Sequence, residues 1–195
     1  MKELQDYRTA DYEIDPIYLK RWSPRSFLEK DVPEQVLYSL FEAARWAPSA
    51  ANVQPWRFVV ARTVVDRERF LTFINDGNKA WCRKAPVLVA VISKAVEERF
   101  GGKNPSHAFD TGTAWGFLAL EAARKGLVTH AMGGFNRQEA KKLLQIPEGF
   151  DVQAIVAIGY QGDKAELNET LQEREIPSNR HRVEDFTFEG LFPNE

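Results

Sequence analysis

The most constraining feature of the sequence is the continuous apolar run "PVLVAVIS" at residues 86–93. It is rich in β-branched residues and lacks polar alternation, which predicts a strand buried on both faces. Further strands are predicted at 56–62, 127–132 and 151–160. A strand covered on both faces needs helices on each side of its sheet. We therefore expect one sheet between two layers of helices.

Helices are predicted between these strands from the spacing of apolar residues. Their ranges are 16–21, 33–46, 66–76, 108–126 and 136–146. Pro33 suits the first helical position with Asp31 as a cap, Asp76-Gly77 would end the third helix, and Gly126 would cap the fourth. Residues 1–15 are expected to be irregular and 96–107 mobile. The order predicts a mixed α/β sandwich of the α+β class in one domain, residues 1–195.

Composition excludes several classes of function. The 195 residues carry a formal net charge of -2, which does not favour nucleic acid or an anionic membrane as partner. One cysteine, Cys82, allows no intramolecular disulfide. The polar start and the lack of a long apolar run predict a cytoplasmic protein.

Catalysis by side chains alone has little support in the sequence. His107, His130 and His181 lie far apart, and no nucleophile-elbow or metal-ligand motif accompanies them, so we expect no metal site. Glu173 and Glu175 are interpreted as solvated charges. The five tryptophans are interpreted mainly as core or interface residues.

The tail, residues 163–195, is polar but ends in alternating apolar residues, "FTFEGLF". This alternation predicts an extended segment that adds to a sheet edge. The tail could fold back on its own domain. We favour an arm that reaches a second subunit, because an exposed strand edge readily accepts another strand.

The segment "RWAPSAANVQPWRF" ends a helix in an unusual loop. Between Pro48 and Pro55 it places Ser49, Asn52 and Gln54, and the prolines limit the freedom of the backbone. Such a loop suits a planar, hydrogen-bonding ligand, and it equally suits a well-capped turn.

Two basic clusters, "KRWSPR" at 20–25 and "SNRHR" at 178–182, could bind a phosphate. Each alone could be a solvated loop. With the amide loop they outline a nucleotide-like cofactor, with a phosphate at one end and a ring at the other. No GxGxxG or GxxxxGK[ST] motif occurs, so neither a Rossmann nor a P-loop cradle is implied.

The segments that carry a resemblance to a known family are "RWSPRSF", "LFEAARWAPSAANVQPWRFVV", "APVLVAVIS", "DTGTAWGFLALEAARKGL" and "AMGGF". They resemble the nitroreductase family of FMN-dependent oxidoreductases, in order and over nearly the whole chain. The resemblance implies a central, mostly antiparallel sheet flanked by helices. It also implies a homodimer with two FMN sites at the subunit interface.

The resemblance also implies site residues. Arg21, Trp22 and Ser23 would bind the phosphate and the ring edge, and Arg180 and Arg182 would complete the phosphate site. The residues reaching in from the partner subunit would be Pro48, Ser49, Ala50 and Asn52.

The remaining implied contacts concern the flavin ring. Gln54 would lie close to the flavin, Gly133 and Gly134 would present a backbone N–H to flavin N5, and Asn78 would bond the pyrimidine end. Gly133 stands where some members have an acidic residue. Trp81 stands where a flavin-binding Lys can occur, so no positive charge near N1 is implied.

The activity implied by the resemblance is hydride transfer from NADH or NADPH through flavin N5 to an electron-poor small molecule, in ping-pong order. The acceptor would be a nitroaromatic, a quinone or an activated alkene. The alternatives are a flavin-binding or sensing module without turnover and a reductive dehalogenase on the same scaffold.

Overall fold

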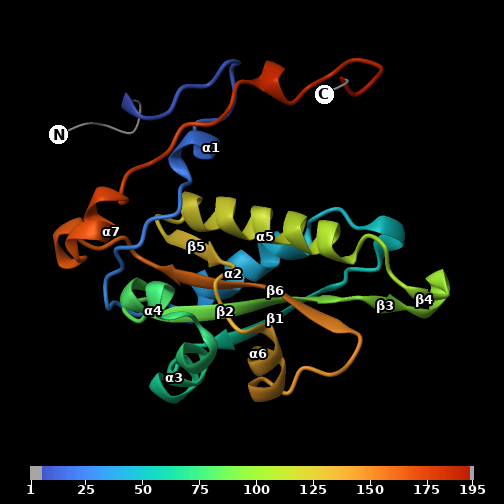
Figure 1. Cartoon of the computed structure of the whole chain (residues 1–195), viewed down its shortest axis with the longest axis horizontal. Coiled ribbons are helices and arrows are strands. Elements are labelled where there is room, and N and C mark those ends of the chain that lie inside the picture. The colour runs from blue at the N-terminus through green and yellow to red at the C-terminus, as the bar shows by residue number, and fades with distance from the viewer. Residues whose placement is uncertain (1–5, 194–195) are drawn as a thin grey trace.

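The computed structural model describes residues 6–193, and its centre is a four-stranded sheet (Figure 1). The strands are β1 (Trp56–Ala61), β2 (Val87–Lys94), β6 (Phe150–Gly159) and β5 (Val128–Met132), in that order across the sheet. All three neighbouring pairs are antiparallel, with Ala90 of β2 opposite Ile155 of β6. The α+β sandwich with an antiparallel sheet is confirmed.

Helices cover both faces of the sheet, as the apolar run at 86–93 requires (Figure 1). One face carries α2 (Glu34–Arg45) and α5 (His107–Arg124), with the short α1 (Ile17–Lys20) outside them. The other face carries α3 (Val64–Phe73), α4 (Asp76–Cys82) and α6 (Arg137–Leu143). Each face has its own core, one around Leu40, Val89 and Leu118 and the other around Phe70, Leu88 and Ile155.

Two predicted helix ends are wrong. Pro33 lies outside α2 with ψ 140°, and no side chain caps that helix, so Asp31 does not act as predicted. Asp76-Gly77 does not end a helix but begins α4, because the extended Asn75 breaks the chain direction and a new helix follows. Gly126 has φ +76° just after α5, as its predicted capping role requires.

The connection at 96–107 contains a small hairpin, β3 (Val96–Glu97) and β4 (Gly102–Lys103), joined by a 3-10 turn. The mobility expected for the connection at 96–107 stays a prediction. Among residues 6–193, no helix is both long enough and apolar enough to cross a bilayer.

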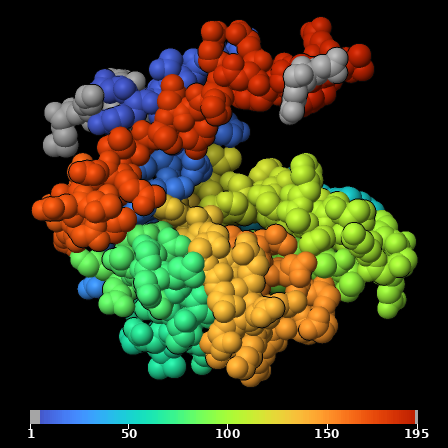
Figure 2. All heavy atoms as spheres, viewed as in Figure 1, coloured from blue at the N-terminus to red at the C-terminus, as the bar shows by residue number. Residues whose placement is uncertain are grey.

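The tail leaves the sandwich after α7 (Glu169–Glu173) and runs beside the N-terminal segment (Figures 1 and 2). The N–H of Val183 donates to Asp11 Oδ2 at 2.9 Å. Residues 163–193 form no strand and pair with no described strand of this chain. The predicted arm to a second subunit stays a prediction. The tail nevertheless does not fold back on its own sheet, and Phe186 and Phe192 remain 61% and 78% exposed. Residues 1–5 and 194–195, the ends of the predicted lead-in and arm, lie outside the described part.

Candidate functional site

The loop after α2 is held in a strained conformation. Ala51, Asn52 and Gln54 have φ of 49°, 55° and 52°, and they are three of the four non-glycine residues with positive φ among residues 6–193. Each such residue costs about 1–2 kcal/mol, and clusters of this kind occur at functional sites. The Ser49 hydroxyl accepts from the Gln54 N–H at 2.9 Å, and Gln54 Nε2 donates to Asn52 Oδ1 at 2.9 Å. The predicted residues 49, 52 and 54 therefore form one rigid unit.

A buried carboxylate fixes the start of this loop. Asp110, 3% exposed, lies in the first turn of α5. Its Oδ2 accepts from the Ser49 hydroxyl at 2.8 Å and from the Ala50 N–H at 2.9 Å, and more weakly from Ser106 Oγ at 3.4 Å. We did not predict this residue. The feature of the sequence that could have identified Asp110 is its place in the first turn of a helix, where the helix dipole favours an acid.

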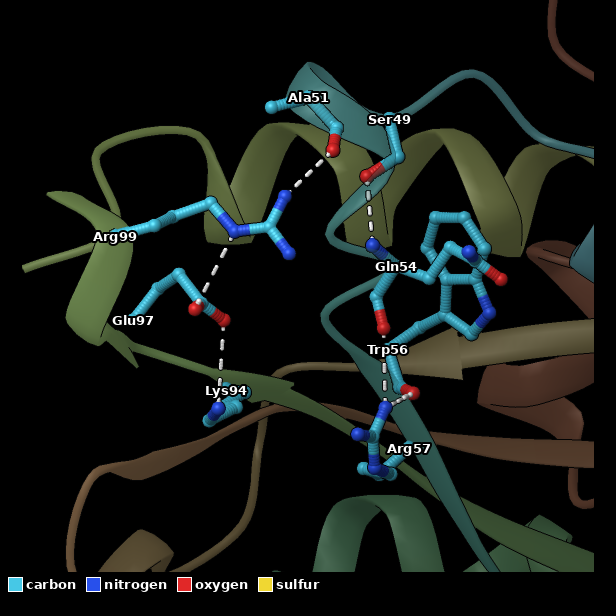
Figure 3. A network of polar contacts seen from close by, with 8 residues as sticks. All are labelled: Ser49, Ala51, Gln54, Trp56, Arg57, Lys94, Glu97 and Arg99. Carbon is cyan, nitrogen blue, oxygen red and sulfur yellow. Dashed lines mark hydrogen bonds and ion pairs between the residues drawn. The ribbon is translucent and has the colours of Figure 1, made fainter.

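Two arginines hold the carbonyl groups of the same loop (Figure 3). Arg99 Nη1, from the hairpin, donates to the Ala51 carbonyl at 2.9 Å, and Arg57 Nη1 donates to the Gln54 carbonyl at 3.0 Å. Glu97 orients Arg99 from the other side, with Nε and Oε1 3.6 Å apart. The loop is thus held from α5, from the hairpin and from β1.

A second group of site residues gathers where the lead-in meets the tail. Arg8, Arg21, Arg180 and Arg182 line one cavity of about 390 Å³. Burial first, and then the charge of Arg180, lower the pKa of Arg8 and of Arg21. None of the ion pairs between described residues includes Arg8, Arg21 or Arg180. A cavity with clustered, unpaired positive charges is suited to an anion.

The other predicted residues of this group are arranged differently. Arg182 forms an ion pair with Glu184 at 3.1 Å, so its charge already has a partner in this chain. The Ser23 hydroxyl accepts from Arg21 Nη1 at 3.4 Å. Trp22 lines a neighbouring cavity of about 320 Å³, which Arg21 also lines.

The segment after Arg21 is anchored by a tail residue that we interpreted wrongly. Glu175 is 5% exposed, not solvated. Its carboxylate accepts from the N–H groups of Arg25 and Ser26, both at 2.8 Å, and from Ser26 Oγ at 2.7 Å. A buried acid of this kind needs such partners, and only the fold brings them together.

The same segment runs beside β5. His130 Nδ1 lies 2.9 Å from the carbonyl of Pro24, which can only accept, so this nitrogen carries the hydrogen. Burial is the main cause that lowers the pKa of His130, which keeps the ring neutral. The ring also packs on Trp81 at 4.4 Å, and Trp81 is 2% exposed. Trp81 is therefore a core residue.

The strand β5 leads to the two glycines. Asn78 Nδ2 donates to the Gly134 carbonyl at 3.1 Å, so two predicted residues meet here. A Cβ on Gly134 would lie 2.7 Å from that Nδ2, whereas a Cβ on Gly133 would meet nothing within 4 Å. Thr129, beside Arg21, lies four residues before Gly133, or about 13 Å along a strand. This length would allow one cofactor to place its phosphate near Arg21 and its ring near Gly133.

The strained loop and the arginines do not meet within one chain. Asp110 binds the loop at the start of α5, whereas Ala123, near its end, lines the cavity beside Arg21. These two positions are 13 residues apart, or about 20 Å along a helix. Pro48 is exposed and belongs to the strained loop, which Asp110 binds at the start of α5.

The nitroreductase family model matches residues 18–80 and 72–160, and the chain belongs to this family. The chain is similar to a solved structure described as an oxidoreductase containing FMN, with TM-score 0.92 and 42% identity over 96% of this chain and 97% of that one.

Two curated relatives add to this comparison. A Streptomyces coelicolor protein, named as a candidate NADH dehydrogenase/NAD(P)H nitroreductase, is 44% identical over 75 residues, which is 38% of this chain and 36% of that protein. The match thus spans about a third of that relative. The iodotyrosine deiodinase of Haliscomenobacter hydrossis is 28% identical over 174 residues, 74% of this chain and 78% of that protein.

Proposed function

We propose that the protein is an FMN-dependent NAD(P)H oxidoreductase. The observation that carries the proposal is the order of three groups: the cavity lined by Arg8, Arg21 and Arg180, the segment at 21–25 that contacts β5 through His130, and the Asn78–Gly134 contact just after β5. The charged end suits a phosphate dianion, and the amide end suits a flavin ring. The solved FMN-containing relative, at 42% identity, supports the same cofactor.

When bound, FMN would supply hydride transfer from NADH or NADPH at N5 and onward to a nitroaromatic, a quinone or an activated alkene, in ping-pong order. Arg21 and Arg180 would hold the phosphate, with the Ser23 hydroxyl beside them. Asn78 would orient the pyrimidine end, and the N–H groups at Gly133 and Gly134 would stabilise charge near N5. No side-chain acid is needed in this scheme.

We also propose a homodimer in which residues 48–54 approach the flavin of the partner subunit. Both groups of site residues are well formed, yet they lie at opposite ends of α5. An apolar stripe on α5 supports a dimer interface, since Phe109 and Phe117 are 79% and 39% exposed, with Gly112 and Gly116 between them. A cavity of about 950 Å³ between α1 and α5 could receive part of the partner, such as the exposed end of its tail around Phe186 and Phe192.

A second candidate activity is reductive dehalogenation, which the iodotyrosine deiodinase relative supports. We rank it lower because, in the described part of the chain, the modest connection at 94–107 with its short hairpin is the segment available as a cover. Iodide release from 3-iodotyrosine with NADH or NADPH would favour it. A binding or sensing module remains the alternative without turnover, and absence of NAD(P)H oxidation with every acceptor would favour that. We place the protein in the cytoplasm, where pyridine nucleotides are supplied.

Titration of the protein with FMN tests the site. Arg21→Ala and Arg180→Ala should each weaken FMN binding by about tenfold to a hundredfold, as expected for loss of a hydrogen bond to a charged group. Arg69→Ala is the matched control, because Arg69 pairs with Asp66 on the exposed surface of α3. If both site variants bound FMN like the wild type, the phosphate site would be assigned to the wrong residues.

A further inference from the structure

Arg8 lies outside every motif of the sequence and is nevertheless buried at 8% exposure. Its side chain joins three segments. Nη1 donates to the carbonyl of Leu19 at 2.7 Å and to that of Arg21 at 2.6 Å, and Nε donates to the carbonyl of Ser178 at 3.0 Å. One guanidinium therefore connects the lead-in, the beginning of the 20–25 cluster and the tail.

Arg8 contacts the backbone at or near Arg21 and Arg180, the two arginines proposed for the phosphate. Arg21 supplies one of the carbonyl acceptors directly, and Ser178 is two residues before Arg180. Arg180 Nη1 in turn donates to the hydroxyl of Ser178 at 3.1 Å. A planar fork can satisfy several acceptors at fixed angles, which a lysine ammonium on a flexible stem cannot.

Arg8 also brings charge to the cavity. The carbonyl groups satisfy its hydrogen bonds but do not neutralise it, and Arg21 and Arg180 add like charges that lower its pKa after burial. Asp11 lines the same cavity, and its Oδ2 accepts from the N–H of Val183. None of the ion pairs between described residues includes Arg8. A buried cation without an ionic partner is costly, and a bound dianion would remove that cost.

We propose that Arg8 is a positioning residue that assembles the phosphate site and makes the protein select FMN over riboflavin. This rests on the proposed function, because it assumes that the arginine cavity holds the flavin phosphate. Arg8 holds Arg21 and the tail in register and contributes a third positive charge to the same cavity. Arg8 contacts the backbone of Leu19, Arg21 and Ser178 and none of the residues proposed for the ring, so we expect its effect to be confined to the phosphate.

The test compares FMN and riboflavin binding, by flavin fluorescence, to the full chain freed of flavin. For the wild type, Arg8→Gln and Arg8→Lys, the quantity measured is the ratio of the riboflavin Kd to the FMN Kd. Arg8→Gln should lower this ratio at least tenfold, at an unchanged riboflavin Kd. Arg8→Lys keeps a charge but loses the fork, and should lower it by about threefold or more.

The matched control is Arg67→Gln. Arg67 also donates to a backbone carbonyl, that of Ala85 at 3.1 Å, but lines a different cavity beside α3. It should lower the thermal midpoint without changing the ratio. An unchanged ratio in the Arg8 variants, or an equal loss of FMN and riboflavin binding, would overturn the inference. If Arg8→Gln does not fold, Arg8→Lys decides by the same criterion. A wild type that binds neither flavin would instead overturn the proposed function.

Discussion

Asp110→Ala should release the strained loop and destabilise the protein measurably. Asp110 Oδ2 accepts two short hydrogen bonds, from the Ser49 hydroxyl and the Ala50 N–H. A hydrogen bond to a charged group contributes about 1.5–3 kcal/mol, and water can replace part of this at the exposed Ala50. Two bonds at the lower limit of this range give about 3 kcal/mol, and water at Ala50 reduces the expected loss in the free energy of unfolding to about 2–3 kcal/mol.

The assay is thermal and urea unfolding of Asp110→Ala, Asp110→Asn and the wild type. For a chain of this length, 2–3 kcal/mol corresponds to a fall in Tm of about 4–12 °C. Asp110→Asn keeps one acceptor but no charge, and should lose about half as much, since neutral hydrogen bonds are weaker. FMN affinity should fall with the loop, because residues 49–54 would leave their strained conformation.

Asp66→Asn is the control for this experiment. Asp66 is an acid near the start of α3 whose partners, Thr63 and Arg69, are exposed, so its loss should cost about 1 kcal/mol or less. If Asp110→Ala unfolded within about 0.5 kcal/mol of the wild type, Asp110 would not hold the loop as its contacts indicate.

Two further predictions concern other parts of the fold. Gly134→Ala should displace the Asn78 amide, lower the free energy of unfolding by about 1–2 kcal/mol and weaken FMN binding. Gly133→Ala places its Cβ in open space and should change the free energy of unfolding by no more than about 0.5 kcal/mol. Urea unfolding of both variants measures this, and equal effects would contradict the packing argument. Burial raises the pKa of Cys82 to about 12 from 9.0. The folded state therefore favours the protonated thiol: its contribution to stability is complete below pH 9 and is lost progressively as pH rises from 9 to 12. A thiol reagent at pH 8 should modify Cys82 only in urea, and rapid labelling of the folded protein would refute this.

The parts of the fold set by local pattern were predictable. The apolar run at 86–93 gave β2, and one-sided apolar spacing gave α2 and α5, because a buried strand and an amphipathic helix have distinct periods. Helix α4 was missed, because Asp76-Gly77 is a common turn signal and only the extended Asn75 makes it a helix start.

The site was predictable only where a motif carried it. The family resemblance named Asn78 and Gly134 separately, and the contact between them comes from the fold. Arg8 and Glu175 were not named as site residues, since their partners lie up to 170 residues away in the sequence. A charged residue is exposed by default, and only tertiary contacts can bury it. The predicted arm to a second subunit stays a prediction, and the contact of the tail with its own lead-in was not foreseen, because apolar alternation does not specify which segment receives the tail.

The most direct test of the central claim is the visible absorption spectrum of the purified protein without oxygen, before and after addition of NADH or NADPH. We predict a flavin spectrum that bleaches on addition of one of the nucleotides, from a cofactor that is released by denaturation and has the mass of FMN. A colourless protein that also fails to bind added FMN would contradict the cofactor assignment. A yellow protein that neither nucleotide bleaches would contradict the proposed NAD(P)H-dependent turnover.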